Sequence, residues 1–356
     1  MKESAIMPFT DIKRLAGKHI RYMYKWPLLL PRVAANYAEL LLLKRPRLRA
    51  VEFAVTYRCN AACKHCSAVG LEDKSRKELG AGEIIRIAAE ARKLGALNIN
   101  YTGGEALLRD DLEEIIAASR PESTVVSVAT NGKLFTAKRA EGLARAGLKI
   151  VSISLDSRVP SEHDDFRGTR GMFRAALQAV EIAKGFGIEP FLCTTVTSKS
   201  INNGGTRALI DLADRLDVTI TLQTACPVGN WAEENEQLLA PRDRGIFYKL
   251  TRLPHVRWEG ISNYLKEGCP AAVEKLAITP YGEVMPCVFF HVSYGNLREE
   301  SLQSIWTRML QKGPFYKIRK GCPVAEDPDF REKWLPPGRD SIHKPVPIDE
   351  LEAFDD

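Results

Sequence analysis

The segment Val51-Glu-Phe-Ala-Val-Thr-Tyr-Arg-Cys59-Asn-Ala-Ala-Cys63-Lys-His-Cys66 joins a short apolar run to three closely spaced cysteines. The run has the length and composition of a buried strand, so the cysteines are expected on the loop that follows it. A spacing of three residues and then two lets one loop place thiolates on three corners of a 4Fe-4S cluster. No fourth cysteine follows nearby, and the segment therefore predicts a cluster in which one iron stays open.

Two other uses of these cysteines are weaker. Zinc usually takes four ligands from two separated pairs, whereas cysteines two residues apart within a pair occur only once here. A disulfide scaffold is opposed by the lack of a signal peptide pattern and by the presence of only eight cysteines in 356 residues. We expect a cytoplasmic protein.

The positive charge of the chain is concentrated near its start. The net charge is +6, and residues 1–50 hold eleven Lys or Arg against three Asp or Glu. The rest of the chain is slightly acidic, so nucleic-acid binding is not expected. The length predicts one main domain and a smaller one.

Residues 27–43 are apolar but too short and too polar to span a bilayer. Leu29, Val33, Tyr37 and Leu41 recur every four residues and predict an amphipathic helix that ends before Lys44. Two interpretations are open. The helix packs on the main domain, or it brings residues 1–49 to an anionic lipid surface at the inner face of a membrane.

Residues 51–225 alternate between short β-branched runs and helical patterns, which predicts an α/β fold with a parallel sheet. Strands are expected at 51–56, 96–101, 124–129, 149–155, 191–196 and 218–223, and helices near 82–94, 110–119, 136–146, 172–186 and 204–215. The loops that follow the strands should carry the chemistry.

The cysteine spacing, together with Thr102-Gly103-Gly104-Glu105 after the second predicted strand, resembles the radical S-adenosylmethionine (SAM) superfamily. In that family the open iron binds SAM, and one electron splits SAM to a 5'-deoxyadenosyl radical that removes a hydrogen atom from the substrate. The resemblance implies a partial (β/α)6 barrel, a 4Fe-4S cluster on the three cysteines, SAM as a second cofactor, and a reducing partner such as flavodoxin or ferredoxin.

The same resemblance assigns the SAM-binding residues. Gly103 and Gly104 allow a close backbone approach, and Glu105 would contact the amino group of SAM. The other residues expected at SAM are Thr130, Asn131, Ser154 and Asp156, with Arg167 at its carboxylate and His65 near its adenine. The alternatives are a turn at Asn131 and a helix cap at Asp156.

Two cysteines lie apart from these motifs. Cys193 falls inside the fifth predicted strand and is interpreted as a buried core thiol. Cys226 follows the sixth predicted strand, at the end of the barrel where the active site is expected. Cys226 is a candidate catalytic residue that returns a hydrogen atom to the substrate, and a passive thiol is the alternative.

A second group of cysteines follows residue 260. Cys269, Cys287 and Cys322, with a hairpin turn at Tyr281-Gly282, resemble the auxiliary iron-sulfur domains called SPASM and twitch. Three cysteines are too few for two clusters, so one auxiliary cluster is expected. Its fourth ligand is left open among His291, Glu326, Asp327, Cys226, water and substrate, and a zinc site completed by His291 is the alternative.

Together these patterns predict four regions: a helical segment at 1–49, a barrel at 50–235, an auxiliary-cluster domain at 236–335, and a tail at 336–356. We expect an enzyme that makes a small molecule or lipid, with an auxiliary cluster that assists oxidation or binds substrate. A peptide-modifying maturase is one alternative. Another is a non-catalytic iron-sulfur protein that carries electrons or senses redox state, although such a carrier would have no use for the SAM-binding loop at Glu105.

Overall fold

The apolar runs of the first part of the chain form parallel strands in the computed structural model, which describes residues 26–258, 260, 268–315, 321–335 and 345–352. The strands are β1 (Ala50–Thr56), β2 (Asn98–Gly103), β3 (Val125–Thr130), β4 (Ile150–Ser154), β5 (Glu189–Val196) and β6 (Thr219–Thr224). Each pairs in parallel with the next, because helical crossovers return the chain to the same edge. The predicted partial barrel is confirmed, with strand ends within two residues of those expected.

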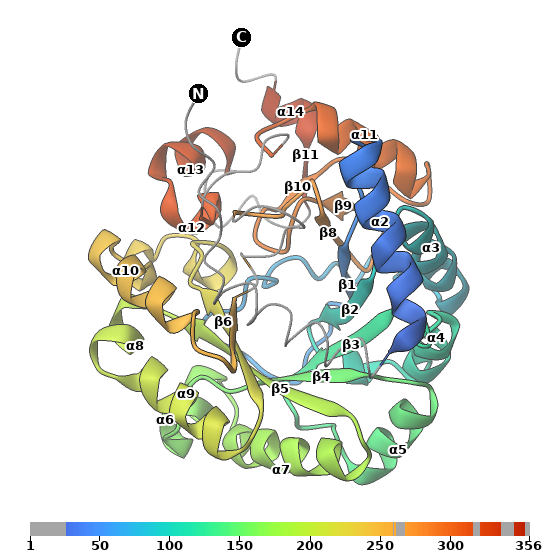
Figure 1. Ribbon diagram of the computed structural model, residues 1–356. Helices are drawn as coiled ribbons and strands as arrows, with labels where there is room; N and C mark the ends of the chain where they lie inside the picture. The colour runs from blue at the N-terminus through green and yellow to red at the C-terminus, as the bar shows by residue number, and fades with distance from the viewer. Residues whose placement is uncertain (1–25, 259, 261–267, 316–320, 336–344, 353–356) are drawn as a thin grey trace.

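Helices cover the outer face of this curved sheet (Figure 1). They are α3 (Ala81–Lys93), α4 (Leu112–Ala118), α5 (Ala137–Arg145), α6 (Pro160–Phe166), α7 (Met172–Gly185), α8 (Ser198–Asn202), α9 (Gly205–Arg215) and α10 (Pro241–Leu250). Short 3-10 turns occupy Pro27–Leu29, Ala106–Leu108, Gly229–Trp231 and Asn235–Gln237. Several helices begin at side-chain caps, such as Thr136 accepting from the Arg139 N–H and Glu83 accepting from the Gly80 N–H.

The C-terminal part of the chain continues the same sheet. The described sheet has the order β7-β6-β5-β4-β3-β2-β1-β8-β9, with β7 (Val256–Trp258) beside β6 and β8 (Lys275–Ile278) parallel to β1. β8 and β9 (Val284–Met285) form the expected hairpin, where Gly282 has a φ of +99°. The remaining elements are β10 (Val292–Ser293), α11 (Leu302–Gln311), α12 (Pro323–Glu326), α13 (Pro328–Trp334), β11 (Val346–Pro347) and α14 (Ile348–Glu352).

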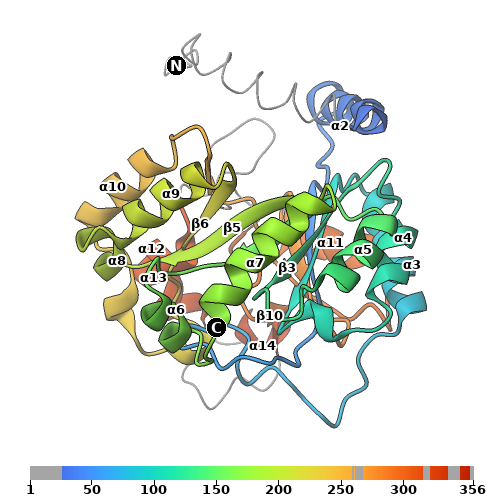
Figure 2. The same cartoon turned by 90° about the horizontal axis from the view of Figure 1, so that it is seen from below.

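Helix α2 (Leu30–Leu42) lies across the amino end of the barrel (Figure 2). Arg32 donates to the carbonyls of Arg92 and Ala96, and Asn36 donates to the Gly95 carbonyl, all just before β2. These contacts support the interpretation of a helix packed on the main domain. Within the described residues, no helix is long and apolar enough to cross a membrane.

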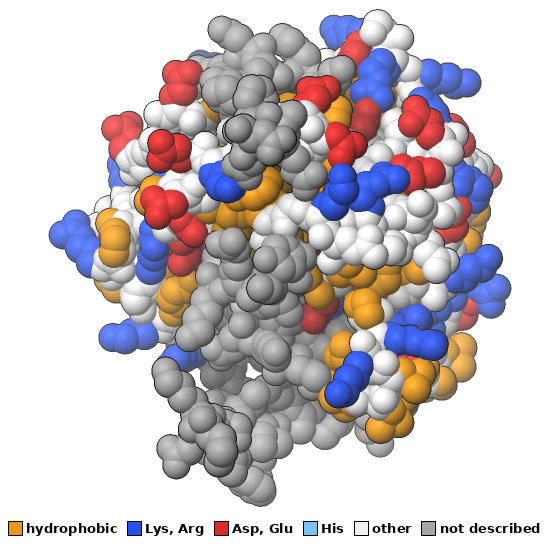
Figure 3. All heavy atoms as spheres, turned by 90° about the horizontal axis from the view of Figure 1, so that it is seen from above, with side chains coloured by type: hydrophobic (Ala, Val, Ile, Leu, Met, Phe, Trp, Pro, Cys, Tyr) orange, Lys and Arg blue, Asp and Glu red, His pale blue; other side chains and the backbone are white. Residues whose placement is uncertain are grey.

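The outer surface of α2 is unusually apolar. The exposed large hydrophobic side chains of the described chain include Leu28, Leu41, Leu42 and Leu43, all on or beside this helix. Figure 3 shows hydrophobic and basic side chains gathered side by side on this part of the molecule. The lipid-surface interpretation of residues 1–49 stays a prediction, and residues 1–25 lie outside the described part of the chain.

The strands separate an apolar layer from a polar one. Side chains alternate between the two faces of a strand, so the buried Val126 and Val128 of β3 face the helices while Ser127 between them faces the inside of the barrel. The same alternation places Asn98 and Asn100 of β2 inside the barrel. The main hydrophobic core therefore lies between sheet and helices, and the lumen of the barrel is lined by polar and apolar side chains together.

Candidate active site

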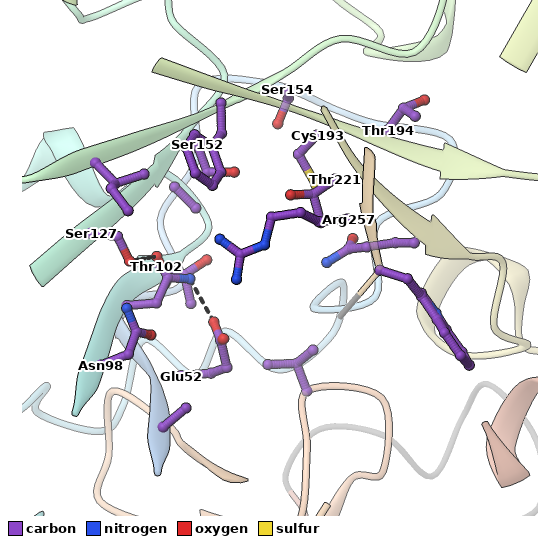
Figure 4. Close-up of a pocket in the computed structure, with 18 of the residues that line it drawn as sticks. Glu52, Asn98, Thr102, Ser127, Ser152, Ser154, Cys193, Thr194, Thr221 and Arg257 are labelled. Carbon is purple, nitrogen blue, oxygen red and sulfur yellow. Dashed lines mark hydrogen bonds between the residues drawn. The ribbon is translucent and has the colours of Figure 1, made fainter. Parts of the chain in front are cut away.

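The lumen of the barrel holds a cavity of about 2690 Å³. It extends from the residues of α2 at the amino ends of the strands to the cysteine loop at their carboxyl ends. Figure 4 shows polar side chains from β1 to β7 directed into it. The labelled ones are Glu52, Asn98, Thr102, Ser127, Ser152, Ser154, Cys193, Thr221 and Arg257, whereas the labelled Thr194 of β5 points away from it.

Charged groups in this lumen come from both edges of the barrel. Lys275 of β8 lies 3.1 Å from Glu52 of β1, and Glu52 also accepts a hydrogen bond of 2.5 Å from Asn100. Arg257 of β7 reaches from the opposite side toward the middle of the cavity (Figure 4). Its guanidinium carbon lies 5.5 Å from the ring centre of Phe191, which supports the stem of the side chain.

Cys59, Cys63 and Cys66 line the carboxyl end of this cavity and are free thiols. One side of their loop is held by the segment after α6, because the N–H groups of Ala62 and Lys64 donate to the carbonyls of Arg167 and Phe166 at 3.3 and 2.9 Å. These backbone bonds fix the loop without using any side chain of the cysteines. The thiols are left to bind a ligand.

The other side of the cysteine loop is held by Gly229 and Asn230, which the sequence analysis did not single out. The Asn230 N–H donates to the Cys66 carbonyl at 3.0 Å, and its side-chain amide donates to the Cys63 carbonyl at 2.8 Å. A Cβ on Gly229 would lie 2.1 Å from the Cys66 carbonyl oxygen. The available signal was the position of this glycine just beyond the sixth predicted strand.

Gly103 and Gly104 both line the cavity and pack against the start of the cysteine loop. A Cβ on Gly103 would lie 2.0 Å from the Thr56 carbonyl oxygen, and one on Gly104 would lie 2.3 Å from that of Arg58. The backbone then continues the contact, with the Glu105 N–H donating to the Arg58 carbonyl at 2.9 Å. The glycines thus allow the end of β2 and the cysteine loop to lie in direct contact.

The Glu105 carboxylate is buried beneath this contact. It accepts hydrogen bonds from the N–H groups of Leu107 and Asn131 and from the hydroxyl of Thr130, at 2.8 to 3.1 Å. Burial raises the pKa of its carboxyl group, and these donors oppose that effect. A carboxylate has further lone pairs, so the expected contact to an ammonium group of SAM stays a prediction.

Thr130 and Asn131 join the end of β3 to the same loop. The Asn131 amide donates to the Asn60 side chain at 2.7 Å, and its oxygen accepts from the Lys133 N–H at 3.0 Å. Asn131 therefore stabilises a turn and also lines the cavity. Ser154, at the end of β4, lines the cavity beside them.

Asp156 and Arg167 form a buried ion pair next to Cys63. The Arg167 guanidinium donates from Nε and Nη2 to the same carboxylate oxygen, at 2.7 and 2.6 Å. Burial alone would raise the pKa of Asp156, but the charge of Arg167, together with His65, His163 and the hydrogen bond from the Thr195 N–H, holds that pKa below its usual range. Arg167 lines the cavity, and Asp156 supports it from behind by also accepting from the Thr195 N–H at 3.2 Å.

His65 lines the cavity between the second and third cysteines of the loop. Its ring stacks on Phe166 with 4.4 Å between centres and lies 5.7 Å from the ring of Trp231. Burial lowers its pKa to about 4, so the ring is neutral at physiological pH. A neutral flat ring at this edge of the cavity is suited to contact another flat ring.

The first cysteine set fits a cluster with an open iron. Burial raises the pKa of the Cys59 thiol to about 11, and a cluster would bind the thiolate form and release the proton. Among the described residues, no three His, Cys, Asp or Glu side chains converge tightly enough to hold a single metal ion. Three free thiols on one loop at the end of the cavity are the donor type that an iron-sulfur cluster takes.

The second cysteine set also comes together. Cys269, Cys287 and Cys322 interact electrostatically with one another and with Cys226, and all four are free thiols. Burial raises the pKa of Cys287 to about 12. Their chemistry fits an iron-sulfur cluster, for which thiolates are the usual ligands.

The oxygen and nitrogen candidates for the fourth position have other hydrogen-bond partners. Glu326 accepts from the Tyr248 hydroxyl at 2.8 Å and from the Cys322 N–H at 3.0 Å. Asp327 caps α13 through the Phe330 N–H at 3.0 Å. His291 contacts the Val288 carbonyl at 3.1 Å through Nε2, and its buried Nδ1 has no hydrogen-bond partner.

Comparison with known proteins decides between the interpretations of these sites. The model of the radical SAM superfamily matches residues 53–212, and that of an iron-sulfur cluster-binding domain, SPASM, matches residues 269–326. The chain belongs to the radical SAM superfamily. It is therefore an enzyme that uses a 4Fe-4S cluster and SAM, and its SPASM domain implies additional iron-sulfur binding.

Several curated radical SAM enzymes are similar along most of the chain. An AdoMet-dependent heme synthase of Methanosarcina barkeri is 30% identical over 73% of this chain and 82% of its own. One of Nitratidesulfovibrio vulgaris is 25% identical over 74% of this chain and 80% of its own. PqqA peptide cyclase of Rhizobium meliloti is 28% identical over 71% of this chain and 72% of its own.

Solved structures show the same radical SAM fold. SuiB of Streptococcus suis bound to its precursor peptide SuiA has a TM-score of 0.60 at 18% identity, covering 86% of this chain and 71% of that one. The structure of anSMEcpe with bound AdoMet has a TM-score of 0.56 at 16% identity, covering 74% and 81%.

Proposed function

We propose that this radical SAM enzyme abstracts a hydrogen atom from a polar small molecule held in the barrel lumen, as one step in the biosynthesis of that molecule. The observation that carries this proposal is one continuous cavity: the same lumen is lined by Cys59, Cys63 and Cys66 at its end and by polar side chains along its walls. A cluster bound at these cysteines, given an electron by a flavodoxin or ferredoxin, would split SAM to the 5'-deoxyadenosyl radical.

The residues of the chain have distinct roles in this proposal. Glu105 and Arg167 stand on either side of the cysteine loop, where they would bind the amino and carboxylate groups of SAM, and His65 would contact the adenine. Gly103 and Gly104 hold the end of β2 directly against the loop, at the wall of the cavity where SAM would bind. Apolar side chains of α2 line the cavity at its amino end.

The walls of the lumen favour a polar, carboxylate-bearing substrate over a lipid chain. Ser127, Ser152 and Thr221 offer hydroxyl groups, and Arg257 offers a cation directed at the middle of the cavity. A guanidinium binds carboxylates with two parallel hydrogen bonds. The similarity to AdoMet-dependent heme synthases supports a tetrapyrrole with carboxylate side chains as the class to test first.

A peptide substrate is the second candidate. PqqA peptide cyclase is 28% identical to this chain, and SuiB, which was solved with a precursor peptide, shares its fold. A peptide would enter between the barrel and the SPASM domain, and its acidic side chains would also suit Arg257. Product analysis with a tetrapyrrole and with an acidic peptide distinguishes the two.

The first test is SAM cleavage by the anaerobically reconstituted protein with dithionite. We expect 5'-deoxyadenosine from the wild-type enzyme and none from a variant in which Cys59, Cys63 and Cys66 are all alanine. Cys193→Ala, which removes a lumen thiol away from the loop, is the matched control and should retain cleavage. Intact SAM with the wild-type protein, at full iron content, would falsify the proposal.

A further inference from the structure

Cys226 leaves the end of β6 and lies against the SPASM cysteines, although it is 43 residues from the nearest of them in sequence. Its side chain is 5% exposed, and it lines the same cavity as Gly268, Val288 and Gly321, which neighbour the three SPASM cysteines in sequence. Cys322 acts on it electrostatically. Cys269 and Cys287 also lie close enough to act on it electrostatically. The barrel sheet and the SPASM domain thus meet at four thiols.

We propose that Cys226 is the fourth ligand of the auxiliary cluster, which the SPASM domain holds with Cys269, Cys287 and Cys322. This inference rests on the auxiliary cluster assumed for the proposed function. The four thiols interact with one another, are free of disulfide bonds, and come from four separate segments; Cys226 is buried and the other three are partly buried. Four thiols brought together in this way form a typical donor set for a 4Fe-4S cluster.

The competing ligands are less suited to this position. Both Glu326 and Asp327 serve neighbouring backbone N–H groups, and Glu326 also holds the Tyr248 hydroxyl, so each would have to give up hydrogen bonds. His291 contacts the Val288 carbonyl through Nε2, and its buried Nδ1, which has no hydrogen-bond partner, makes it the remaining competitor. Within the described part of the chain, the Cys226 side chain has one hydrogen bond to give up, to the Thr224 carbonyl.

Cys226 is correspondingly a poor hydrogen-atom donor to substrate. Its sulfur donates to the Thr224 carbonyl oxygen at 3.6 Å and lies near the SPASM cysteines, although the residue also borders the cavity. A catalytic role for Cys226 was the expectation from sequence, and the geometry points instead to the auxiliary site. A cluster with four protein thiolates has no vacant iron for substrate, which limits it to electron transfer.

The experiment uses the full chain in a background with alanine at Cys59, Cys63 and Cys66, so that only auxiliary iron is measured. Iron and sulfide are counted after anaerobic reconstitution, and the dithionite-reduced EPR spectrum is recorded. We expect one 4Fe-4S cluster in this background. We expect a changed EPR signal and at least a twofold loss of iron after Cys226→Ser, and no change after Cys193→Ser, the matched control on β5.

Added cyanide gives a second readout that does not depend on the folding of a variant. The auxiliary EPR signal of the background protein should not respond to cyanide if four thiolates fill all positions, whereas the signal of Cys226→Ala should shift. A cyanide response in the background protein, or an unchanged spectrum after Cys226→Ser, overturns the assignment of Cys226. If the background protein binds no iron at all, the auxiliary cluster itself is absent. This outcome is distinguishable from the failure of the Cys226 assignment, in which iron is bound but does not depend on Cys226.

Discussion

The guanidinium of Arg167 connects the buried carboxylate of Asp156 to a cysteine of the first cluster site. Nη2 lies 2.6 Å from Asp156 Oδ2, and Nη1 lies 3.8 Å from Cys63 Sγ. Asp156 and the Cys63 sulfur both raise the pKa of Arg167, although its burial opposes them. Arg167 therefore pairs with the buried Asp156 and also places a positive charge beside the proposed cluster site.

Arg167→Met should alter both properties. Leaving Asp156 buried without its partner should cost roughly 3–5 kcal/mol of stability, seen as a lower melting temperature of the reconstituted enzyme. Removing a positive charge beside Cys63 should also shift the midpoint potential of the first cluster to a more negative value in an EPR-monitored redox titration.

Two further variants separate these effects. Asp156→Asn combined with Arg167→Met removes both charges and should recover most of the lost stability while the potential stays shifted. Arg167→Lys keeps a cation and should keep the potential close to that of the wild type. A potential that is the same in all three variants would show that this guanidinium does not act on the cluster.

Gly229→Ala should remove the first cluster, because its Cβ would lie 2.1 Å from the Cys66 carbonyl oxygen at a φ of +61°. Gly187→Ala is the matched control, since it has a φ of +73° but open space around the added methyl group. The control should cost only about 1–2 kcal/mol of stability and retain its iron. Equal iron contents in the two variants would contradict the role of Gly229 as a support of the loop.

The comparison of Gly229 with Gly103 shows what the sequence could predict. The alternation of apolar residues determines the strands and the helices between them, and the glycines of Thr102-Gly103-Gly104-Glu105 belong to a local motif, so both could be identified. Gly229 and Asn230 contact the cysteine loop from more than 160 residues away, and only the closure of the sheet brings them there. The proximity of Cys226 to Cys322 depends in the same way on tertiary structure.

Arg257→Gln should weaken the binding of a carboxylate-bearing ligand without affecting the cleavage of SAM alone. Loss of one charge-assisted interaction costs about 1.5 kcal/mol or more, so we expect the dissociation constant of coproporphyrin, used as a tetracarboxylate probe, to rise about tenfold. Arg257→Lys keeps the charge and should show a smaller effect. Coproporphyrin that binds all three proteins equally, or none, would argue against a tetrapyrrole site at Arg257.

The stability of the enzyme should decrease between about pH 6.5 and pH 4, in part because of His163. Its buried Nδ1 accepts the Asp156 N–H at 3.1 Å, and burial lowers its pKa to about 4. The unfolded chain, with a histidine pKa of about 6.5, binds the proton first, so the contribution is complete above pH 6.5 and is lost as the pH falls toward 4.

His163→Asn tests this contribution because the asparagine oxygen can replace Nδ1 as an acceptor but does not titrate in this range. The midpoint of urea unfolding at pH 7.5 and at pH 5.0, with iron content monitored, should differ less in the variant, by an amount on the order of 1–2 kcal/mol. The same pH difference in both proteins would assign the acid sensitivity to other groups.

The exposed leucines of α2 test the lipid-surface interpretation. Leu41, Leu42 and Leu43 are more than half exposed and are followed directly by the exposed Lys44 and Arg45. If this surface binds anionic lipid, the full chain should co-sediment with phosphatidylserine vesicles, and Leu42→Asp should weaken binding by about tenfold or more, since one buried leucine is worth about 1.5–3 kcal/mol. Ile246→Asp, at an exposed apolar residue of α10, is the matched control and should bind like the wild type.

Vesicle binding should also weaken when the salt concentration is raised about tenfold, from about 0.05 to about 0.5 M, because salt screens the attraction between the basic residues and the anionic lipid. Equal sedimentation of all three proteins, or none at low salt, would leave α2 as a helix that packs on the main domain through its contacts to Gly95 and Ala96.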